Sequence, residues 1–145
     1  MSISVELERV QEEAVARGPG AFLLTVTDDG RPHVVAVTVG WDGAALVMSA
    51  GRTSVRNAGG RPGVSVLWPP AEAGGYSLIV DGKASAVANE AGDGGHVTIE
   101  PTRAVLHRPA AGAGAGADAA SAEDGACGSD CVPLLRTAPT GSSRR

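Results

Sequence analysis

Three arginines lie close together in a part of the chain that carries no acidic side chain. Arg52, Arg56 and Arg61 all fall within residues 43–71, and that range contains no Asp or Glu, although the whole chain of 145 residues has a formal net charge of −4. A guanidinium group can bind two phosphate oxygens at once, and nearby hydroxyls add further donors. The composition of this range therefore indicates an anion-binding site.

The same range is expected to join a strand to a short helix. Residues 44–50 are mainly apolar, as in a strand, and residues 53–58 have room for about one and a half helical turns before a Gly-Gly pair. Backbone N–H groups at the start of a helix lack partners within it and point toward a bound anion. Arg52 and Arg56 are four residues apart and share a face of such a helix. This arrangement favours a ligand that carries a phosphate.

An alternative interpretation of the arginines needs no ligand. They can be ordinary loop residues that form surface ion pairs with carboxylates from elsewhere in the chain. The candidate partners are Glu6, Glu12 and Asp81.

The segments around this site predict a mainly β protein. Long apolar, β-branched runs indicate burial on both faces of several strands, as in a closed or nearly closed antiparallel barrel. Neither crossover helices nor βαβ spacing is present, which excludes a Rossmann fold. The expected order is a helix at 4–17 with Ser4 as N-cap and Gly18-Pro19 as its end, strands at 21–27, 33–40 and 44–50, the short helix, and strands at 63–68, 75–90 and 96–109, with a bend at Asp81-Gly82 and a kink or edge at Pro101.

The last third of the chain differs in composition from the rest. Residues 110–145 are rich in Gly, Ala and Ser and cannot bury enough apolar surface to offset chain entropy, so we expect a folded domain at 1–109 and a disordered, low-complexity tail at 110–145. The Gly-Ala repeat at 112–117 lacks the strand and acidic residue of a dinucleotide site. Cys127 and Cys131 are interpreted as an incidental pair in this tail.

Several classes of function are disfavoured by composition and spacing. An acidic chain is not expected to bind nucleic acid in general, because such binding depends on many Lys and Arg contacts to phosphates. No apolar run approaches the roughly 20 residues of a membrane helix. The acidic, amphipathic start is unlike a secretion signal, so a cytoplasmic protein is expected. His33, His96 and His107 lack metal-ligand spacing and are interpreted as surface residues, and no metal site is predicted. No carboxylate pair or nucleophile elbow suggests a hydrolase.

Residues 48–68, MSAGRTSVRNAGGRPGVSVLW, resemble a recurring pattern of the pyridoxamine 5′-phosphate oxidase-like family of FMN-binding split barrels, including its F420-dependent branch. The matching parts are Val55-Arg56-Asn57 and the Pro-Gly-Val-Ser of residues 62–65, and residues 75–87 resemble the family's later strand. The resemblance covers about residues 5–108. The family usually has a lysine or arginine two residues before Arg56, where this chain has Ser54, and Arg52 is the nearest substitute.

The resemblance implies a six-stranded antiparallel split β-barrel with an N-terminal helix and one short helix. It also implies a homodimer that holds the cofactor between its subunits and performs redox chemistry on a small-molecule substrate, with no protein residue assigned to catalysis. FMN is the expected cofactor, with F420 as the alternative and haem as a less favoured one. The implied cofactor-binding residues are Arg52, Thr53, Ser54 and Arg56 at the phosphate, Val35, Ala36, Val37 and Thr38 along the ring system, and Met48 and Ser49 at the approach to it.

Two other functions remain open for the same barrel. One is a non-catalytic module that binds flavin or haem for storage or sensing. The other is a barrel that has lost its cofactor and acts as a dimeric interaction protein, and Ser54 in place of the basic residue favours both of these over an enzyme.

Overall fold

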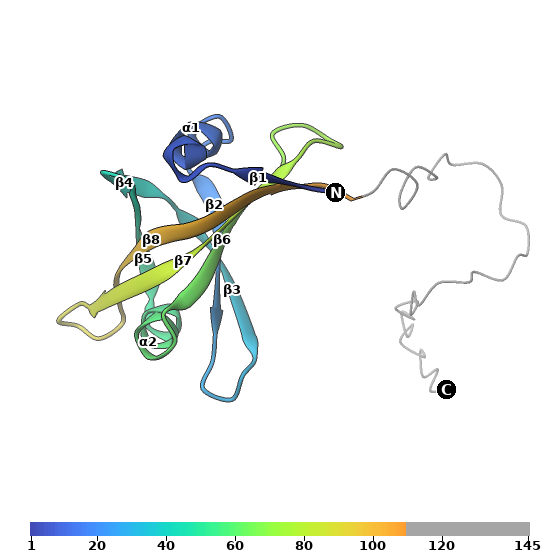
Figure 1. Ribbon diagram of the computed structural model, residues 1–145. Helices are drawn as coiled ribbons and strands as arrows, with labels where there is room; N and C mark the ends of the chain where they lie inside the picture. Colours follow the sequence, from blue (N-terminus) through green and yellow to red (C-terminus); the bar gives the residue numbers. More distant parts are fainter. Residues whose placement is uncertain (110–145) are drawn as a thin grey trace, which may run out of the picture. The chain divides into compact units, whose positions relative to one another are not determined.

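A computed structural model describes residues 1–109 as a curled antiparallel sheet with two helices (Figure 1). Burial alternates along most strands even where the residues are continuously apolar, so one side of the sheet is buried and the other is partly open to solvent, and the expected burial on both faces is wrong for these strands. The strands are β1 (Ser2–Val5), β2 (Gly20–Val26), β3 (Pro32–Thr38), β4 (Gly40–Asp42), β5 (Ala45–Gly51), β6 (Gly63–Trp68), β7 (Ser77–Ala88) and β8 (Gly94–His107), and the helices are the 3-10 turn η1 (Leu7–Arg9), α1 (Val10–Val15) and α2 (Arg52–Gly60).

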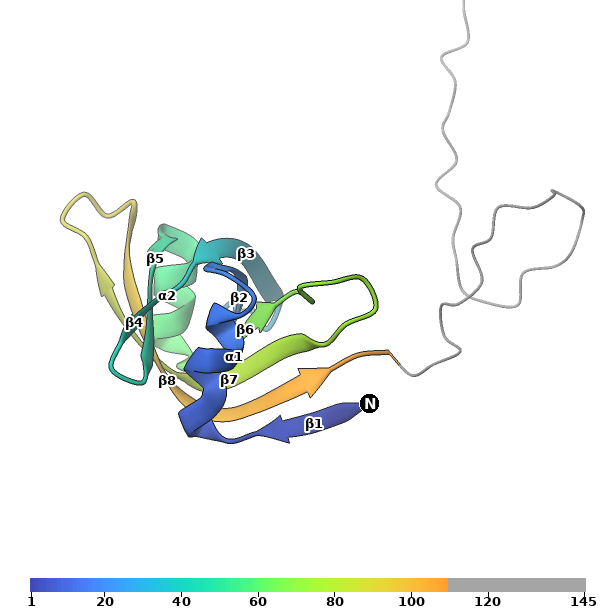
Figure 2. The same ribbon diagram turned by 90° about the horizontal axis from the view of Figure 1, so that it is seen from above.

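The strands are hydrogen-bonded in the order β3-β2-β6-β7-β8-β5-β4, and β1 pairs with β8 outside this path. The sheet curls so that β3, at one end of the order, also lies against β5. The helices α1 and α2 lie at opposite ends of the curled sheet in Figure 1, and Figure 2 views the sheet from the end at which α1 lies. This is an antiparallel split β-barrel, and the mainly β class predicted from the sequence is confirmed.

The core is built from aliphatic side chains, as the scarcity of aromatic residues requires. Strand residues fill most of it, and α1 adds Val10 and Ala14. Burial of a Leu, Ile or Val side chain contributes about 1.5–3 kcal/mol, so the sheet and α1 are held together mainly by these contacts. The largest fully buried side chains include Trp68, Leu23, Leu46, Leu78 and Ile99.

The start of the chain differs from the expected helix over 4–17. Residues 2–5 form β1, and Ser4 pairs with Val105 instead of capping a helix. The reason lies in β8, whose edge is paired with β5 only along residues 94–99 and is free beyond them. β1 covers this free edge, and the helix begins only after η1. The predicted end of the helix at Gly18-Pro19 agrees with the end of α1 at Val15 and the positive φ of Gly18.

The count of eight strands exceeds the six expected because β1 and β4 are added to them. Gly40 was expected to end the strand at 33–40, but residues 40–42 pair with β5 as β4, and the turn that follows lies at Gly43, which has a φ of 60°. Pairing of so short a segment depends on the position of β5, which local sequence does not reveal.

The predicted bend in the long strand is present as a β-bulge between Asp81 and Gly82. Asp81 pairs with Arg103 and Gly82 with Pro101, so Thr102 has no opposite residue. A Cβ atom on Gly82 would lie 2.5 Å from Cγ2 of Ile99. Only glycine fits there, which explains why the bend occurs at this position.

Two further expectations concern membrane-spanning helices and the C-terminal tail. No helix within residues 1–109 is long and apolar enough to cross a membrane. The tail at 110–145, with Cys127 and Cys131, lies outside the described residues.

Candidate functional site

The start of α2 lies at one end of the barrel and has no side-chain cap. Gly51 ends β5 and precedes the helix, and no side chain of residues 1–109 accepts a hydrogen bond from the first N–H groups. The N–H of Arg52 donates instead to the carbonyl oxygen of Asp93, at 3.1 Å. The first turn of α2 contains no acidic residue, so the positive end of the helix dipole is not neutralised there.

A glycine in β8 allows the turn that carries Asp93 to approach the helix so closely. A Cβ atom on Gly94 would lie 2.6 Å from the carbonyl oxygen of Ala50, a distance that a real side chain does not tolerate. Because Gly94 pairs with Gly51, the turn between β7 and β8 sits directly beside the start of α2. Asp93 therefore belongs to the same site as Arg52.

An open hollow runs from the start of α2 along β3 and β5, and we call it the β3–β5 hollow. It consists of two adjoining parts of about 460 and 500 Å³, which share Ala36, Val37 and Ser49. Volumes of this size are typical of small-molecule sites. The part next to α2 is also lined by His33, Val35, Ala50, Gly51, Arg52, Thr53, Ser54 and Asp93, and the other part by Thr38, Val47, Met48 and His96.

Nine of the ten residues proposed from the sequence to bind a cofactor line this hollow. The tenth, Arg56, lies one turn further along α2, where its side chain is exposed but does not line the hollow. The structure thus brings together residues from β3, β5 and α2 that are separated by up to about 20 positions in the chain.

The arginines of the sequence motif have different surroundings. Arg61 forms a salt bridge of 2.7 Å with Asp28 and also donates to the carbonyl oxygen of Asp28. Within residues 1–109, neither Arg52 nor Arg56 forms a salt bridge or a side-chain hydrogen bond. The ion-pair interpretation therefore applies to Arg61 alone, with a partner other than the three suggested by the sequence.

Two of the three carboxylates offered as partners form ion pairs with other arginines. Asp81 pairs with Arg103 at 2.9 Å, and Glu12 pairs with Arg9 at 3.6 Å. In the turn that also contains Asp28, the Thr27 hydroxyl and then the Arg31 guanidinium hold the pKa of the Asp29 carboxyl below its usual value. Most arginines of residues 1–109 outside the hollow are thus paired with carboxylates.

Ser54 is a buried residue of the first turn of α2, and it lines the hollow. The residue is 1% exposed, yet its hydroxyl makes no hydrogen bond to any of residues 1–109. Oδ1 of Asn57 is the only buried side-chain N or O atom without a partner within these residues, so the Ser54 hydroxyl is not both buried and unpaired, and it can donate a hydrogen bond to a ligand atom in the hollow. Among the lining residues of the hollow, Arg52 is the only lysine or arginine.

Another buried polar residue of α2 has a structural role. Nδ2 of Asn57 donates to Oγ1 of Thr25 at 3.1 Å, and both residues are almost fully buried. This bond fastens α2 to β2. Oδ1 of Asn57 has no partner within the described residues, but Asn57 does not line the hollow.

Sequence reasoning missed several residues of the hollow. His33 and His96 were interpreted as surface residues, and both line it, while Asp93 was assigned no role. The signal for His33 was available, because it lies two positions before Val35 on the same strand and so shares its face. Within residues 1–109, no group of three His, Cys, Asp or Glu side chains could hold a metal ion.

No protein-family model matches the chain. An uncharacterized protein of Mycobacterium bovis and one of Mycobacterium tuberculosis are each 40% identical to it over 141 residues, which cover 88% of this chain and 93% of each relative.

Solved structures share the fold at lower identity. A candidate pyridoxamine 5′-phosphate oxidase of Listeria innocua matches with a TM-score of 0.57 and 20% identity, over 70% of this chain and 98% of its own. An F420 reductase matches with a TM-score of 0.52 and 23% identity, over 63% of this chain and 94% of its own. A haem-storage protein of Vibrio cholerae matches with a TM-score of 0.54 and 19% identity, over 70% of this chain and 94% of its own. At these identities the likeness is one of fold.

Proposed function

The chain belongs to the family of the two mycobacterial proteins and has the split-barrel fold of pyridoxamine 5′-phosphate oxidase-like proteins, and on these premises we propose that it binds FMN in the β3–β5 hollow. The observation that carries the proposal is the start of α2, where an unpaired Arg52, an unpartnered Ser54 hydroxyl and uncapped N–H groups meet. These donors would hold the phosphate of the cofactor.

The rest of the hollow suits the ring system of the same ligand. β3 is a terminal strand of the sheet, so the backbone groups on its outer edge have no strand partner and can bond to the polar edge of a flavin. Val35, Ala36 and Val37 of β3 give the hollow an apolar lining, in which Ala36 lies on the opposite face of the strand from the two valines, and Met48 and Ser49 of β5 also line it. A phosphate at one end and a planar ring along the strands therefore match the order of donors and apolar surface.

A second copy of the chain is proposed to cover the hollow, which is open to solvent in one copy. The outer face of β2 and β3 has Phe22 and Val34 at 38% and 52% exposure, next to the half-buried Leu24. Ala36 continues this face and also lines the hollow. Contiguous exposed apolar surface of this kind is typical of an interface, and a two-fold dimer would bury it on both copies.

We propose that the complex is an oxidoreductase acting on a small molecule. The cofactor, when bound, would supply the transfer of electrons or hydride. The residues of this chain would anchor the phosphate, orient the ring along β3 and exclude water together with the partner copy. The Asp93 carboxylate is negative, like the phosphate, and repels it. The net attraction therefore depends on Arg52 and the start of α2 outweighing this repulsion.

Two observations support other ligands in the same hollow. F420 also carries a phosphate and a tricyclic ring, so the start of α2 suits it equally. His33 and His96 both line the hollow and are candidates for the axial ligand of a haem in a non-catalytic binding module.

The absorption spectrum of the purified protein, followed by titration with FMN, F420 and haemin, separates these functions. Bands near about 370 and 450 nm identify flavin, one near about 420 nm F420, and a sharp Soret band haem, since each spectrum belongs to the cofactor. FMN binding with a loss on Arg52→Ala supports the proposal, and a haem Soret band that is lost on His33→Ala or His96→Ala would replace it with the haem module.

A further inference from the structure

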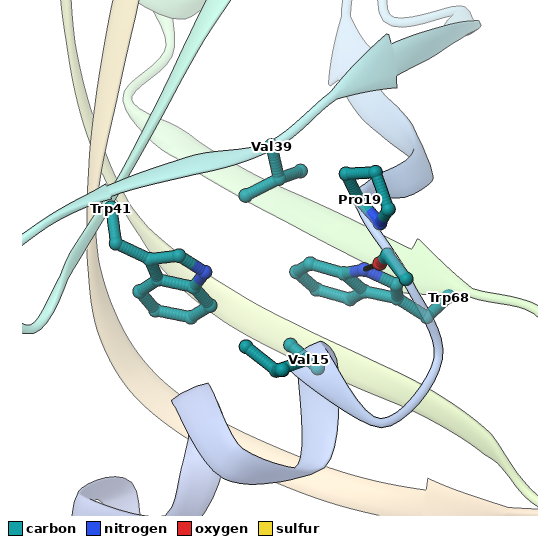
Figure 3. A pocket seen from close by; sticks show the side chains of 7 residues that line it. Val15, Pro19, Val39, Trp41 and Trp68 are labelled. Atoms are coloured by element: carbon teal, nitrogen blue, oxygen red, sulfur yellow. Dashed lines mark hydrogen bonds between the residues drawn. The ribbon is translucent and has the colours of Figure 1, made fainter.

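A separate cavity lies at the other end of the barrel, beside α1 (Figure 3). It has a volume of about 180 Å³ and shares no lining residue with the β3–β5 hollow. It is open on one side and is bounded by the end of α1, the segment that follows it, the connection from β3 to β4, and the strands β4 and β6. The lining residues are Ala14, Val15, Gly18, Pro19, Val39, Trp41 and Trp68.

The two tryptophans differ in how their indole N–H groups are used. Trp68 is fully buried, and its Nε1 donates to the carbonyl oxygen of Gly18 at 3.1 Å. Trp41 is half-buried, and no atom of residues 1–109 accepts a hydrogen bond from its Nε1. In Figure 3 this nitrogen lies on the side of the ring that faces Trp68 across the cavity. The cavity therefore contains one free donor in an otherwise apolar wall.

Water is a poor occupant for such a space. An ordered buried water needs about two to four polar partners, and this wall offers a single donor. A closed apolar cavity of about 150 Å³ is known to bind benzene, and the present cavity is of similar size and apolar lining but open beside Val15. Aromatic rings also favour edge-to-face and offset contacts with other rings, which two indoles can provide.

From these features we infer that the cavity binds a small, uncharged, single-ring aromatic compound that carries one hydrogen-bond acceptor. The ring lies between Trp41 and Trp68, and its acceptor atom takes the hydrogen bond from Nε1 of Trp41. Val15, which is 64% exposed, stands at the mouth, so a ligand enters beside α1 without opening the core.

The test uses the full chain and two probes that differ in the acceptor, acetophenone and toluene. Trp41 and Trp68 are the only tryptophans in the sequence, so a ¹⁵N-labelled sample gives two indole N–H signals, both from this cavity. We expect saturable shifts of both signals with either probe. We also expect acetophenone to bind roughly five- to tenfold more tightly, from one additional hydrogen bond.

Two variants and one control decide the outcome. Ala14→Leu fills the cavity and is expected to abolish both titrations, whereas Ala88→Leu, the same change at an exposed site on β7, leaves them unchanged. Trp41→Phe keeps an aromatic wall without the donor and is expected to bring the affinities for the two probes together. The inference is overturned if neither probe gives a saturable shift, or if acetophenone keeps its advantage in Trp41→Phe. Because no cofactor is needed, failure here is independent of the proposed FMN site.

Discussion

The main-chain N–H of Arg52 donates a hydrogen bond of 3.1 Å to the carbonyl oxygen of Asp93, and this bond fixes the turn between β7 and β8 against the start of α2. The Asp93 side chain is exposed, lines the hollow and accepts a hydrogen bond from Nδ2 of Asn89 at 2.7 Å. None of the salt bridges within residues 1–109 includes it. A carboxylate without a cation partner is thus held at the end of the hollow that is proposed to receive a phosphate.

The first prediction concerns this carboxylate. Asp93→Asn removes a negative charge beside the phosphate while it keeps the shape of the side chain, so FMN affinity should increase. Because Asp93 is exposed and solvent screens its charge, the gain is expected to be only about two- to fivefold. Fluorescence titration of FMN measures it, and the gain should shrink as salt is added. Asp42→Asn, an exposed site outside the hollow, is the control, and an equal gain there would show that only net charge matters.

The second prediction concerns the outer face of β2 and β3. Phe22→Glu introduces a charge into the apolar surface that a second copy is proposed to cover, and the protein is expected to become monomeric. Light scattering after size-exclusion chromatography gives the molar mass directly. Ile3→Glu makes the same kind of change on β1, at an exposed site away from this face, and should leave the dimer intact. A wild-type protein that is monomeric with FMN bound would refute the proposed interface.

The third prediction concerns the bulge that shapes the barrel. Gly82→Ala places a Cβ atom 2.5 Å from Cγ2 of Ile99 and 2.6 Å from the carbonyl oxygen of Glu100. The backbone must shift to accommodate the added atom, and this strain should lower the free energy of unfolding by roughly 1–3 kcal/mol and the melting temperature by several degrees. Gly63→Ala on the neighbouring strand meets no atom within 4 Å and serves as the control. Equal melting temperatures for the two variants would contradict the close approach.

The site shows which parts of such a structure a sequence can reveal. Arg52, Thr53 and Ser54 were predictable because a helix start and its donors are local features of consecutive residues. The facing wall at Val35–Thr38 came from the family resemblance, since nothing in the strand itself indicates that it lies against β5. Asp93 was missed because only the pairing of β8 with β5 brings that turn to α2, more than 30 residues away in the chain.

The differences in the fold have a similar origin. Ser4 and Val5 of β1 were predicted as the start of a helix because Ser4 is a favourable N-cap for the amphipathic segment that follows. The strand forms because β8 is longer than β5 and offers a free edge near Val105. The partner of Arg61 was likewise not predictable, since Asp28 reaches it only after the β2–β3 turn folds toward the end of α2.

The start of α2 is proposed to hold the phosphate of the cofactor, and the whole proposed function depends on this contact. FMN and riboflavin differ only in that phosphate, so calorimetric titration of the protein with both isolates its contribution. We predict that FMN binds far more tightly than riboflavin, and that Arg52→Ala weakens FMN binding by roughly 1.5–3 kcal/mol while it leaves riboflavin unaffected. Arg31→Ala, which removes the same charge from an exposed turn, should change neither affinity. Equal affinity for FMN and riboflavin in the unaltered protein would contradict the claim.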